Sequence, residues 1–236
     1  MTEQVAATHS PEALLANTPL FAVLPADELK ELARTTRTRI YQRGETIFRK
    51  DDPGYSLYIV VSGAVKISVS SYEGDEIILA IFTAGQFFGE LALFDEEPRS
   101  ADAEAIQTAE VLSVQREDLI RVLERRPRVA IIQLLKVLGQ RLRATDELLQ
   151  DAAFLDIPAR LAKRMLELAE QHGQETPQGV RINLRLTQQD LASMIGARRE
   201  NVNRALAYYQ SRGWLAKSQG YFTIMNEQAL RTRALP

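Results

Sequence analysis

The chain contains no cysteine and only two histidines among its 236 residues. The lack of thiols excludes disulfides, thiolate metal sites and cysteine-ligated iron–sulfur clusters. His9 and His172 lie far apart in the sequence, so we interpret both as surface residues and expect no metal site. No stretch approaches the roughly 18 apolar residues that cross a membrane, and no signal-peptide pattern opens the chain. These absences predict a cytoplasmic protein without a metal and without membrane contact.

The net charge of −2 says little about nucleic acid, but the charges are unevenly distributed. Residues 181–236 contain nine Lys or Arg and three Asp or Glu, a local excess of about +6. The preceding residues therefore carry about −8. A basic C-terminal part on an acidic body indicates one domain that meets phosphate and another that does not, with chance asymmetry as the alternative.

The stretch from Arg39 to Val114 is rich in β-branched and aromatic residues. Glycines interrupt it at intervals of about ten residues, at positions 44, 54, 63, 74 and 85. Residues 57–61 and 76–82 have the composition of strands between these breaks. We therefore predict an all-β barrel or sandwich, preceded by two short helices that begin near Pro11 and Pro25.

A long hydrophobic seam follows, in a helix predicted from about Pro127 to Phe154. Its members recur at alternating spacings of three and four residues, the a/d pattern of a coiled coil over nearly three heptads. A seam this long on one helix is typical of pairing with a second copy, so we predict a homodimer. The seam consists of Leu135, Leu138, Leu142, Thr145, Leu149 and Ala152.

The sequence Asp156-Ile157-Pro158 ends this helix and starts another, with Asp156 as the expected N-cap. We predict the boundary between two domains at this break. A polar loop is expected at residues 173–179, followed by a strand-like alternation at residues 180–186.

Residues 187–214 have the pattern of a helix-turn-helix. Thr187 and Asp190 form a capping-box-like start, and Gly196 provides the backbone freedom that a tight turn needs. The second helix has an apolar side for the core, and its polar side can enter the major groove of DNA. That polar side consists of Arg199, Glu200, Asn203 and Arg204.

The chemistry of these side chains suits base and phosphate contacts. Arg199 and Arg204 can each bind guanine O6 and N7, and Glu200 can accept a hydrogen bond from a cytosine amine. Thr187 and Gln189 are expected at phosphate oxygens. Residues 214–225 are predicted to form a hairpin, a wing that carries Lys217. The alternative is an ordinary helical hairpin with a solvated charged face.

A second group of polar residues lies in the predicted β domain, in Phe88-Gly89-Glu90-Leu91-Ala92 and Pro98-Arg99-Ser100-Ala101. An arginine binds phosphate through charge and a forked set of donors. A glutamate accepts from a ribose hydroxyl, and glycine with exposed N–H groups and a serine hydroxyl completes an anion site. Taken alone, these residues fit a surface salt bridge better than a ligand site.

The chain as a whole resembles the cyclic-AMP receptor protein and fumarate–nitrate regulator (Crp/Fnr) family. The resemblance runs from about Leu20 to Met225 and rests on several motifs. It implies an α+β protein: a jelly-roll-like β-roll domain at 1–126, a dimerisation helix at 127–155 and a winged helix-turn-helix domain at 156–236. The motifs are Phe88-Gly-Glu-Leu-Ala-Leu-Phe94, Pro98-Arg-Ser-Ala101, Ala153-Phe-Leu-Asp156, Leu186-Thr-Gln-Gln-Asp190 and Ala197-Arg-Arg-Glu200.

The resemblance also implies a ligand and partners. Gly89, Glu90 and Leu91 would hold the ribose and phosphate side of cyclic AMP, and Arg99 with Ser100 would bind the cyclic phosphate. Thr145 and Asp146 would meet the adenine at the subunit interface. The second domain would read palindromic TGTGA-like DNA through residues 199, 200 and 204, with RNA polymerase as a further partner. The docking geometry is that of the family's type member.

Three departures from the family pattern affect these expectations. The loop between Glu90 and Arg99 is one residue shorter than in the best-known member. Asp146 replaces a hydroxyl residue, which predicts that cyclic AMP outcompetes cyclic GMP. Arg198 replaces a good N-capping residue, and we interpret it as a phosphate contact.

Other functions fit the sequence less well. An iron–sulfur sensor needs cysteines, and a haem sensor is disfavoured because no histidine lies in the predicted β domain. The winged helix disfavours a cyclic-nucleotide-binding subunit without DNA binding. We find no phosphate loop, nucleophile–base pair or metal cluster of an enzyme. The principal alternative is a family member that acts without an effector and has a vestigial or retuned pocket.

Overall fold

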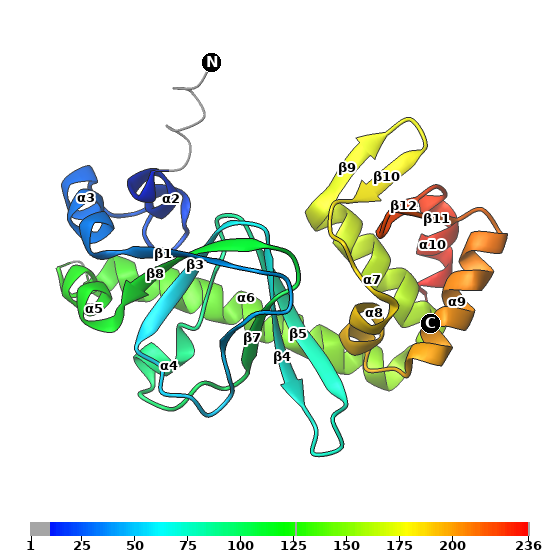
Figure 1. Ribbon diagram of the computed structural model, residues 1–236, viewed down its shortest axis with the longest axis horizontal. Helices are drawn as coiled ribbons and strands as arrows, with labels where there is room; N and C mark the ends of the chain where they lie inside the picture. Colours follow the sequence, from blue (N-terminus) through cyan, green and yellow to red (C-terminus); the bar gives the residue numbers. More distant parts are fainter. Residues whose placement is uncertain (1–9, 126, 236) are drawn as a thin grey trace. The chain divides into compact units, whose positions relative to one another are not determined.

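The computed structural model describes residues 10–125 and 127–235. The chain forms two compact units, one of residues 1–67 with 81–142 and the other of residues 68–80 with 143–236. Figure 1 labels the helices and strands of both units along the chain. Each helix in the described residues is too short or too polar to traverse a lipid bilayer.

Two four-stranded sheets form the β-roll, with strand orders β1-β8-β3-β6 and β2-β7-β4-β5. Strand β8 is central in the first sheet and pairs antiparallel with β1 on one side and β3 on the other. Most neighbours in the two sheets come from distant parts of the sequence, as in a jelly roll, whereas β4 and β5 are consecutive. The strands are β1 (Arg37–Tyr41), β2 (Thr46–Phe48), β3 (Ser56–Ser62), β4 (Ala64–Ser70), β5 (Glu76–Thr83), β6 (Phe87–Phe88), β7 (Asp102–Ala105) and β8 (Ala109–Gln115).

Strands β3 and β8 of the first sheet bury side chains on both faces, because successive side chains of a strand point to opposite sides. Leu57 and Ile59 of β3 pack into a core with three helices and with Leu93 of the short helix α4 (Leu91–Phe94). Val60 of β3 and Val111 of β8 pack into a second core between the strands, together with Phe88. The helices are α2 (Pro11–Asn17), α3 (Ala26–Thr35) and α5 (Arg116–Glu124).

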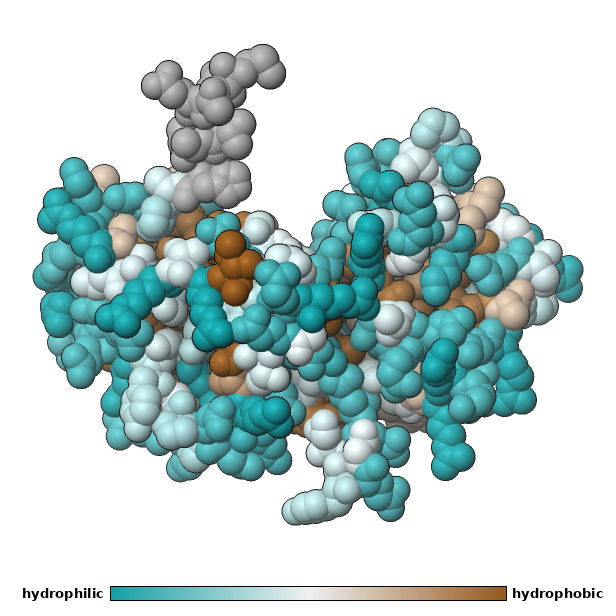
Figure 2. Space-filling model, viewed as in Figure 1, coloured by the Kyte–Doolittle hydropathy of each residue, from teal (hydrophilic) through white to brown (hydrophobic). Residues whose placement is uncertain are grey.

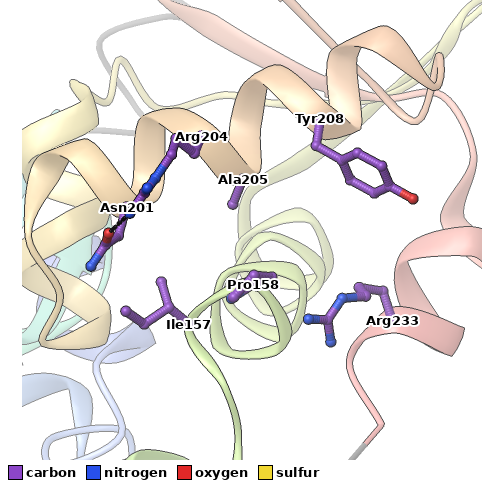
Figure 3. Close-up of a pocket in the computed structure, with 7 residues that line it drawn as sticks. All are labelled: Ile157, Pro158, Asn201, Arg204, Ala205, Tyr208 and Arg233. Atoms are coloured by element: carbon purple, nitrogen blue, oxygen red, sulfur yellow. Dashed lines mark hydrogen bonds between the residues drawn. The ribbon is translucent and has the colours of Figure 1, made fainter.

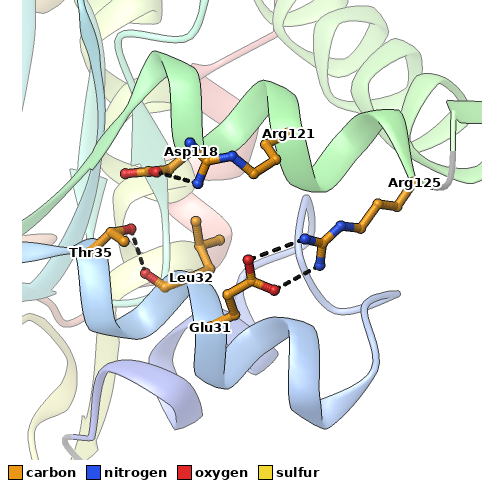
Figure 4. Close-up of polar contacts among 6 residues, drawn as sticks. All are labelled: Glu31, Leu32, Thr35, Asp118, Arg121 and Arg125. Atoms are coloured by element: carbon orange, nitrogen blue, oxygen red, sulfur yellow. Dashed lines mark hydrogen bonds and ion pairs between the residues drawn. The ribbon is translucent and has the colours of Figure 1, made fainter.

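An ion pair at the surface joins α3 to the end of α5. Glu31 accepts hydrogen bonds from Arg125 Nη1 at 2.7 Å and Nη2 at 3.1 Å (Figure 4). The hydrogen bonds and charge of Arg125 lower the pKa of the Glu31 carboxyl. Both side chains are solvent-exposed, so the pair adds little to stability, which comes from the leucines beneath it.

The predicted seam lies on one continuous helix, α6 (Pro127–Phe154). Three of the seam's four leucines are strongly exposed in the single chain, Leu135 by 61%, Leu142 by 63% and Leu149 by 70%, and Leu138 is half-buried. The face of the molecule in Figure 2 is mainly hydrophilic, with hydrophobic residues in small separate groups. A line of exposed leucines at heptad spacing is typical of a helix that packs against a partner.

The second unit contains a three-helix core and a small sheet of order β11-β12-β10-β9. Leu161 and Met165 of α7, Leu191 of α8, Val202 of α9 and Phe222 of β12 are all fully buried. The elements are α7 (Ile157–His172), β9 (Gly173–Thr176), β10 (Gly179–Ile182), α8 (Gln188–Ile195), α9 (Arg199–Ser211), β11 (Leu215–Ser218), β12 (Tyr221–Ile224) and α10 (Glu227–Arg233).

The structure confirms the α+β fold with a β-roll, a long helix and a winged helix-turn-helix. The capping box of Thr187 and Asp190 is formed, and Gly196 has the left-handed conformation, with φ 59° and ψ 48°. One local prediction is wrong: residues 173–176 are strand β9 and not part of a polar loop. Strand β9 is polar because it forms the edge of its sheet, next to β10, where solvent reaches its side chains.

Candidate functional site

The guanidinium of Arg99 is buried in the first unit, and only 4% of the residue is exposed. Its Nη1 donates to the carbonyl oxygen of Gly89 at 2.6 Å and its Nη2 to that of Ser56 at 2.7 Å. Its central carbon lies 4.3 Å from the centroid of the Phe48 ring. The buried Nε has no hydrogen-bond partner in the described parts of the chain. A buried cation with an unused donor is suited to an anionic ligand.

The loop around Arg99 holds the side chain in place before any ligand binds. The Arg99 N–H donates to the carbonyl of Asp52, and the Asp51 N–H donates to the carbonyl of Arg99, both at 2.9 Å. Burial lowers the pKa of Arg99, although Tyr58 and Glu90 act in the opposite direction. The side chain stays charged at any physiological pH, because a guanidinium titrates only in strong base. The structure therefore presents a preformed positive charge.

Gly89 faces this guanidinium at close range. Its φ is +80°, and a Cβ built on it would lie 2.7 Å from Arg99 Nη1. Another residue here would need a strained backbone and would displace the guanidinium. The backbone of Gly89 therefore approaches the Arg99 guanidinium closely, as predicted for a glycine at this position. Its carbonyl oxygen also accepts a hydrogen bond from that side chain.

Glu90 is buried beside Phe87 and Phe88, with 1% of the residue exposed. Its carboxylate forms an ion pair with Arg141 of helix α6, and the same guanidinium donates to the carbonyl oxygen of Phe87. The Arg141 guanidinium also lies 4.9 Å from the Phe82 ring centroid and 5.0 Å from that of Phe87. The long helix is thus bonded directly to the loop that contains Glu90.

Arg141 was missed by sequence reasoning, although one signal was available. It lies four residues before Thr145, and residues four apart lie on the same face of a helix. Of the other predicted pocket residues, Leu91 is 44% exposed and Ser100, next to Arg99, is exposed. Thr145 and Asp146 are exposed on the part of α6 that belongs to the second unit, and their role as ligand contacts stays a prediction.

The polar side of helix α9 is open to solvent. Arg199, Glu200 and Arg204 are exposed, whereas Asn203 is half-buried and its buried Oδ1 has no partner within the described residues. Arg204 donates a hydrogen bond to the Asn201 Oδ1. The structure therefore brings these residues together on one helix face, as the sequence predicted.

The remaining predicted DNA contacts surround this helix. Gln189, Arg198 and Lys217 are all exposed. The Thr187 hydroxyl donates to Asp190 Oδ2 at 2.7 Å in the capping box. Because a hydroxyl has one hydrogen, Thr187 has none left to donate to a phosphate, and Gln189 is the better-suited contact at this helix start.

Two arginines near the wing were also missed. The Arg185 Nε donates to the Tyr221 hydroxyl at 3.2 Å, and the guanidinium carbon of Arg181 lies 5.2 Å from the centroid of the same ring. Arg185 is exposed and lies two residues before Thr187. This spacing from the helix-turn-helix was a usable signal for another phosphate contact.

Comparisons with known proteins cover both units. Residues 38–126 match the cyclic nucleotide-binding domain model, and residues 159–233 match the Crp-like helix-turn-helix domain model. The CRP-like cAMP-activated global transcriptional regulator of Mycobacterium tuberculosis is 36% identical over 221 residues, which are 94% of this chain and 98% of that protein. The cyclic AMP receptor protein of Thermus thermophilus is 35% identical over 188 residues, 80% of this chain and 83% of that protein. The chain belongs to the Crp/Fnr family.

Crp/Fnr regulators are transcription factors and not enzymes, so the site binds and does not catalyse. The solved c-di-GMP responsive global regulator CLP of Xanthomonas campestris is similar in structure, with a TM-score of 0.74 and 26% identity. That similarity covers 86% of this chain and 100% of the CLP chain. The family thus includes a member described as responsive to a nucleotide other than cyclic AMP.

In this Crp/Fnr regulator we expect Arg141→Gln to lower the free energy of unfolding by about 2 kcal/mol, because Glu90 loses its cationic partner. This loss of unfolding free energy is smaller than for a fully buried pair, because the Arg141 side chain is 30% exposed and water can replace it. Urea unfolding measures the change. Arg143→Gln, an exposed arginine two residues further along α6, is the matched control. Equal stability of the two variants would contradict a stabilising role for the Arg141–Glu90 pair.

Proposed function

We propose that this protein is a dimeric transcription regulator that binds palindromic TGTGA-like DNA and is switched by cyclic AMP in its β domain. The observation that carries the proposal is the buried Arg99 guanidinium, whose Nε has no partner among the described residues. A cyclic phosphate supplies the negative charge and acceptor oxygen that this donor needs. The Ser100 hydroxyl, next in sequence, is a further donor to the same phosphate.

The second part of the ligand is a ribose hydroxyl, for which Glu90 is the acceptor. The carboxylate is already paired with Arg141, so a ligand that binds Glu90 must share it with that arginine or displace it. Either change alters a direct bond between the ligand loop and helix α6. Because α6 also carries the dimer seam, this is a physical route from ligand to dimer.

The third part of the ligand is the base, for which we propose Thr145 and Asp146 as contacts. The carboxylate of Asp146 accepts from the exocyclic amine of adenine and repels O6 of guanine. We expect cyclic AMP to bind at least tenfold more tightly than cyclic GMP, about 1.4 kcal/mol, in a competition titration. Asp146→Ser should reduce this preference. Equal affinity of the original protein for both nucleotides would contradict the role of Asp146.

Dimerisation through α6 is supported by the exposed seam leucines. In such a dimer the two recognition helices read two half-sites related by two-fold symmetry, which is why we propose a palindromic operator. Arg199 and Arg204 read guanine and Glu200 reads cytosine, while Gln189, Arg198, Arg185 and Lys217 contact phosphates. We propose RNA polymerase as a further partner and the bacterial cytoplasm as the location.

The test is the affinity of the purified protein for a palindromic TGTGA-type duplex, measured with and without cyclic AMP at fixed salt. We expect the nucleotide to tighten binding tenfold or more, which corresponds to about 1.4 kcal/mol of coupling. Tight binding that is indifferent to cyclic AMP would support the DNA-binding part alone. It would also favour the alternative of a vestigial or retuned pocket.

A further inference from the structure

The connection between α6 and α7 is very short. Helix α6 ends at Phe154 and α7 begins at Ile157, so the joint consists of Leu155 and Asp156. The Asp156 Oδ1 accepts a hydrogen bond from the Ala159 N–H at 2.8 Å and so caps α7. The direction in which the DNA-binding helices leave α6 is set at these two residues.

The C-terminal helix α10 binds this joint. The Arg233 Nη2 donates to both carboxylate oxygens of Asp156, at 2.7 and 2.6 Å. This ion pair joins residues that are 77 positions apart in the sequence. The pKa of Asp156 is lowered chiefly by the hydrogen bond from Arg233. Arg231, two residues earlier, instead pairs with Glu227 inside α10, and none of its bonds within residues 127–235 reaches the joint.

The recognition helix α9 binds the next residues of the same turn. The Tyr209 hydroxyl donates to the carbonyl oxygen of Pro158 at 2.7 Å, and the Tyr209 side chain is fully buried. Burial raises the pKa of Tyr209 to about 12, so the hydroxyl remains a donor at physiological pH. Figure 3 shows α9, the start of α7 and Arg233 around one groove of about 520 Å³.

A third contact crosses the joint itself. Lys163 Nζ of α7 lies 2.8 Å from Asp151 Oδ1 of α6. The start of α7, from its cap Asp156 to Lys163, is therefore bonded to α6, to α9 and to α10, all within the second unit. Of the two ion pairs that α10 forms within the described residues, Arg231–Glu227 is internal to the helix and Arg233–Asp156 reaches the joint.

We propose that α10 positions the recognition helix, and that Arg233 acts as a positioning residue by holding Asp156 at the joint. In a dimer, the angle at this joint sets the distance between the two recognition helices and hence the half-site spacing that is accepted. The proposal rests on the proposed function for the dimer and for the choice of the DNA probe. It concerns DNA geometry and holds for any effector.

The test compares Arg233→Gln with Arg231→Gln, which removes the same charge from the same helix. Each full-length variant is titrated with a TGTGA-type palindrome and with two duplexes whose spacer is one base pair longer or shorter. We expect Arg233→Gln to bind the duplex of native spacing about fivefold more weakly. The ratio of its affinities for native and altered spacing should fall at least threefold. Arg231→Gln should match the original protein in both respects.

Asp156→Ser separates the ion pair from the helix cap, because serine still caps α7. If Arg233 acts through Asp156, the double variant should be no worse than either single variant. Hydrogen exchange of residues 155–160 gives a readout without DNA, and we expect it to be faster in Arg233→Gln than in Arg231→Gln. If the original protein fails to select the TGTGA duplex, the proposed operator is wrong. The hydrogen-exchange result alone then tests the positioning role of Arg233. Exchange and spacing preference equal to those of Arg231→Gln would overturn the positioning role.

Discussion

Arg99→Ala should weaken cyclic AMP binding by roughly thirtyfold or more, because removing one partner of a desolvated charge pair costs about 2–5 kcal/mol. The Nε of the buried guanidinium has no partner within the described residues, and two carbonyl oxygens hold its Nη1 and Nη2 in place. Basal affinity for operator DNA should stay within about threefold, since the variant leaves α8 and α9 unchanged. Calorimetric titration of cyclic AMP and a DNA-binding assay measure the two quantities.

The control for Arg99→Ala must also disturb the same loop region. Arg116→Ala is suitable, because the Arg116 Nε donates to the carbonyl oxygen of Leu93 at 3.0 Å but does not contact Gly89 or Ser56. Both variants lose a side-chain bond to a backbone carbonyl, and only Arg99→Ala loses the proposed phosphate contact. If a folded Arg99→Ala protein bound cyclic AMP as tightly as Arg116→Ala, the assignment of the phosphate site would be wrong.

The second large effect is expected in DNA recognition. Arg199→Ala should weaken binding to a TGTGA-type duplex by about 1–3 kcal/mol, roughly 5- to 150-fold, and relax specificity at one guanine. Arg198→Ala should weaken binding equally on all sequences and reduce the slope of log affinity against log salt by about one. Fluorescence anisotropy with matched and base-substituted duplexes at several salt concentrations distinguishes the two patterns.

Arg212→Ala is the matched control for the recognition helix. Arg212 is at the C-cap of α9, where its guanidinium carbon lies 5.3 Å from the ring centroid of Tyr208. Its loss removes a positive charge from the same helix without altering the polar face of residues 199–204. If Arg199→Ala lost specific affinity only to the extent of Arg212→Ala, Arg199 would act through net charge and not as a base contact.

Features with a local cause were predictable from the sequence. The capping box of Thr187 and Asp190 joins residues three apart, and the seam of α6 follows from spacing along one helix. The order of strands and helices was recognisable for the same reason, since turn residues and periodicity act over short distances. The polar edge strand β9 was mistaken for a loop because solvent-exposed strands lack the apolar alternation that identifies buried ones.

Contacts between distant residues were not predictable in this way. Arg141 meets Glu90 across 51 residues and Arg233 meets Asp156 across 77 residues. Helical periodicity gives the face on which each arginine lies, but the partner depends on how the whole chain packs. Likewise, the sequence motif predicted Arg99 as a phosphate contact, whereas its carbonyl anchors and its unused Nε could be identified only from the folded loop.

In the proposed switch, cyclic AMP and operator DNA each change the binding of the other. One comparison measures this coupling. Cyclic AMP is titrated into the protein alone and into the protein saturated with its operator duplex, at the same salt concentration. Thermodynamic linkage requires DNA to tighten nucleotide binding by the same factor by which the nucleotide tightens DNA binding. We expect the dissociation constant for cyclic AMP to fall tenfold or more when DNA is present. An unchanged constant would show that the two sites are uncoupled and would contradict the proposed switch.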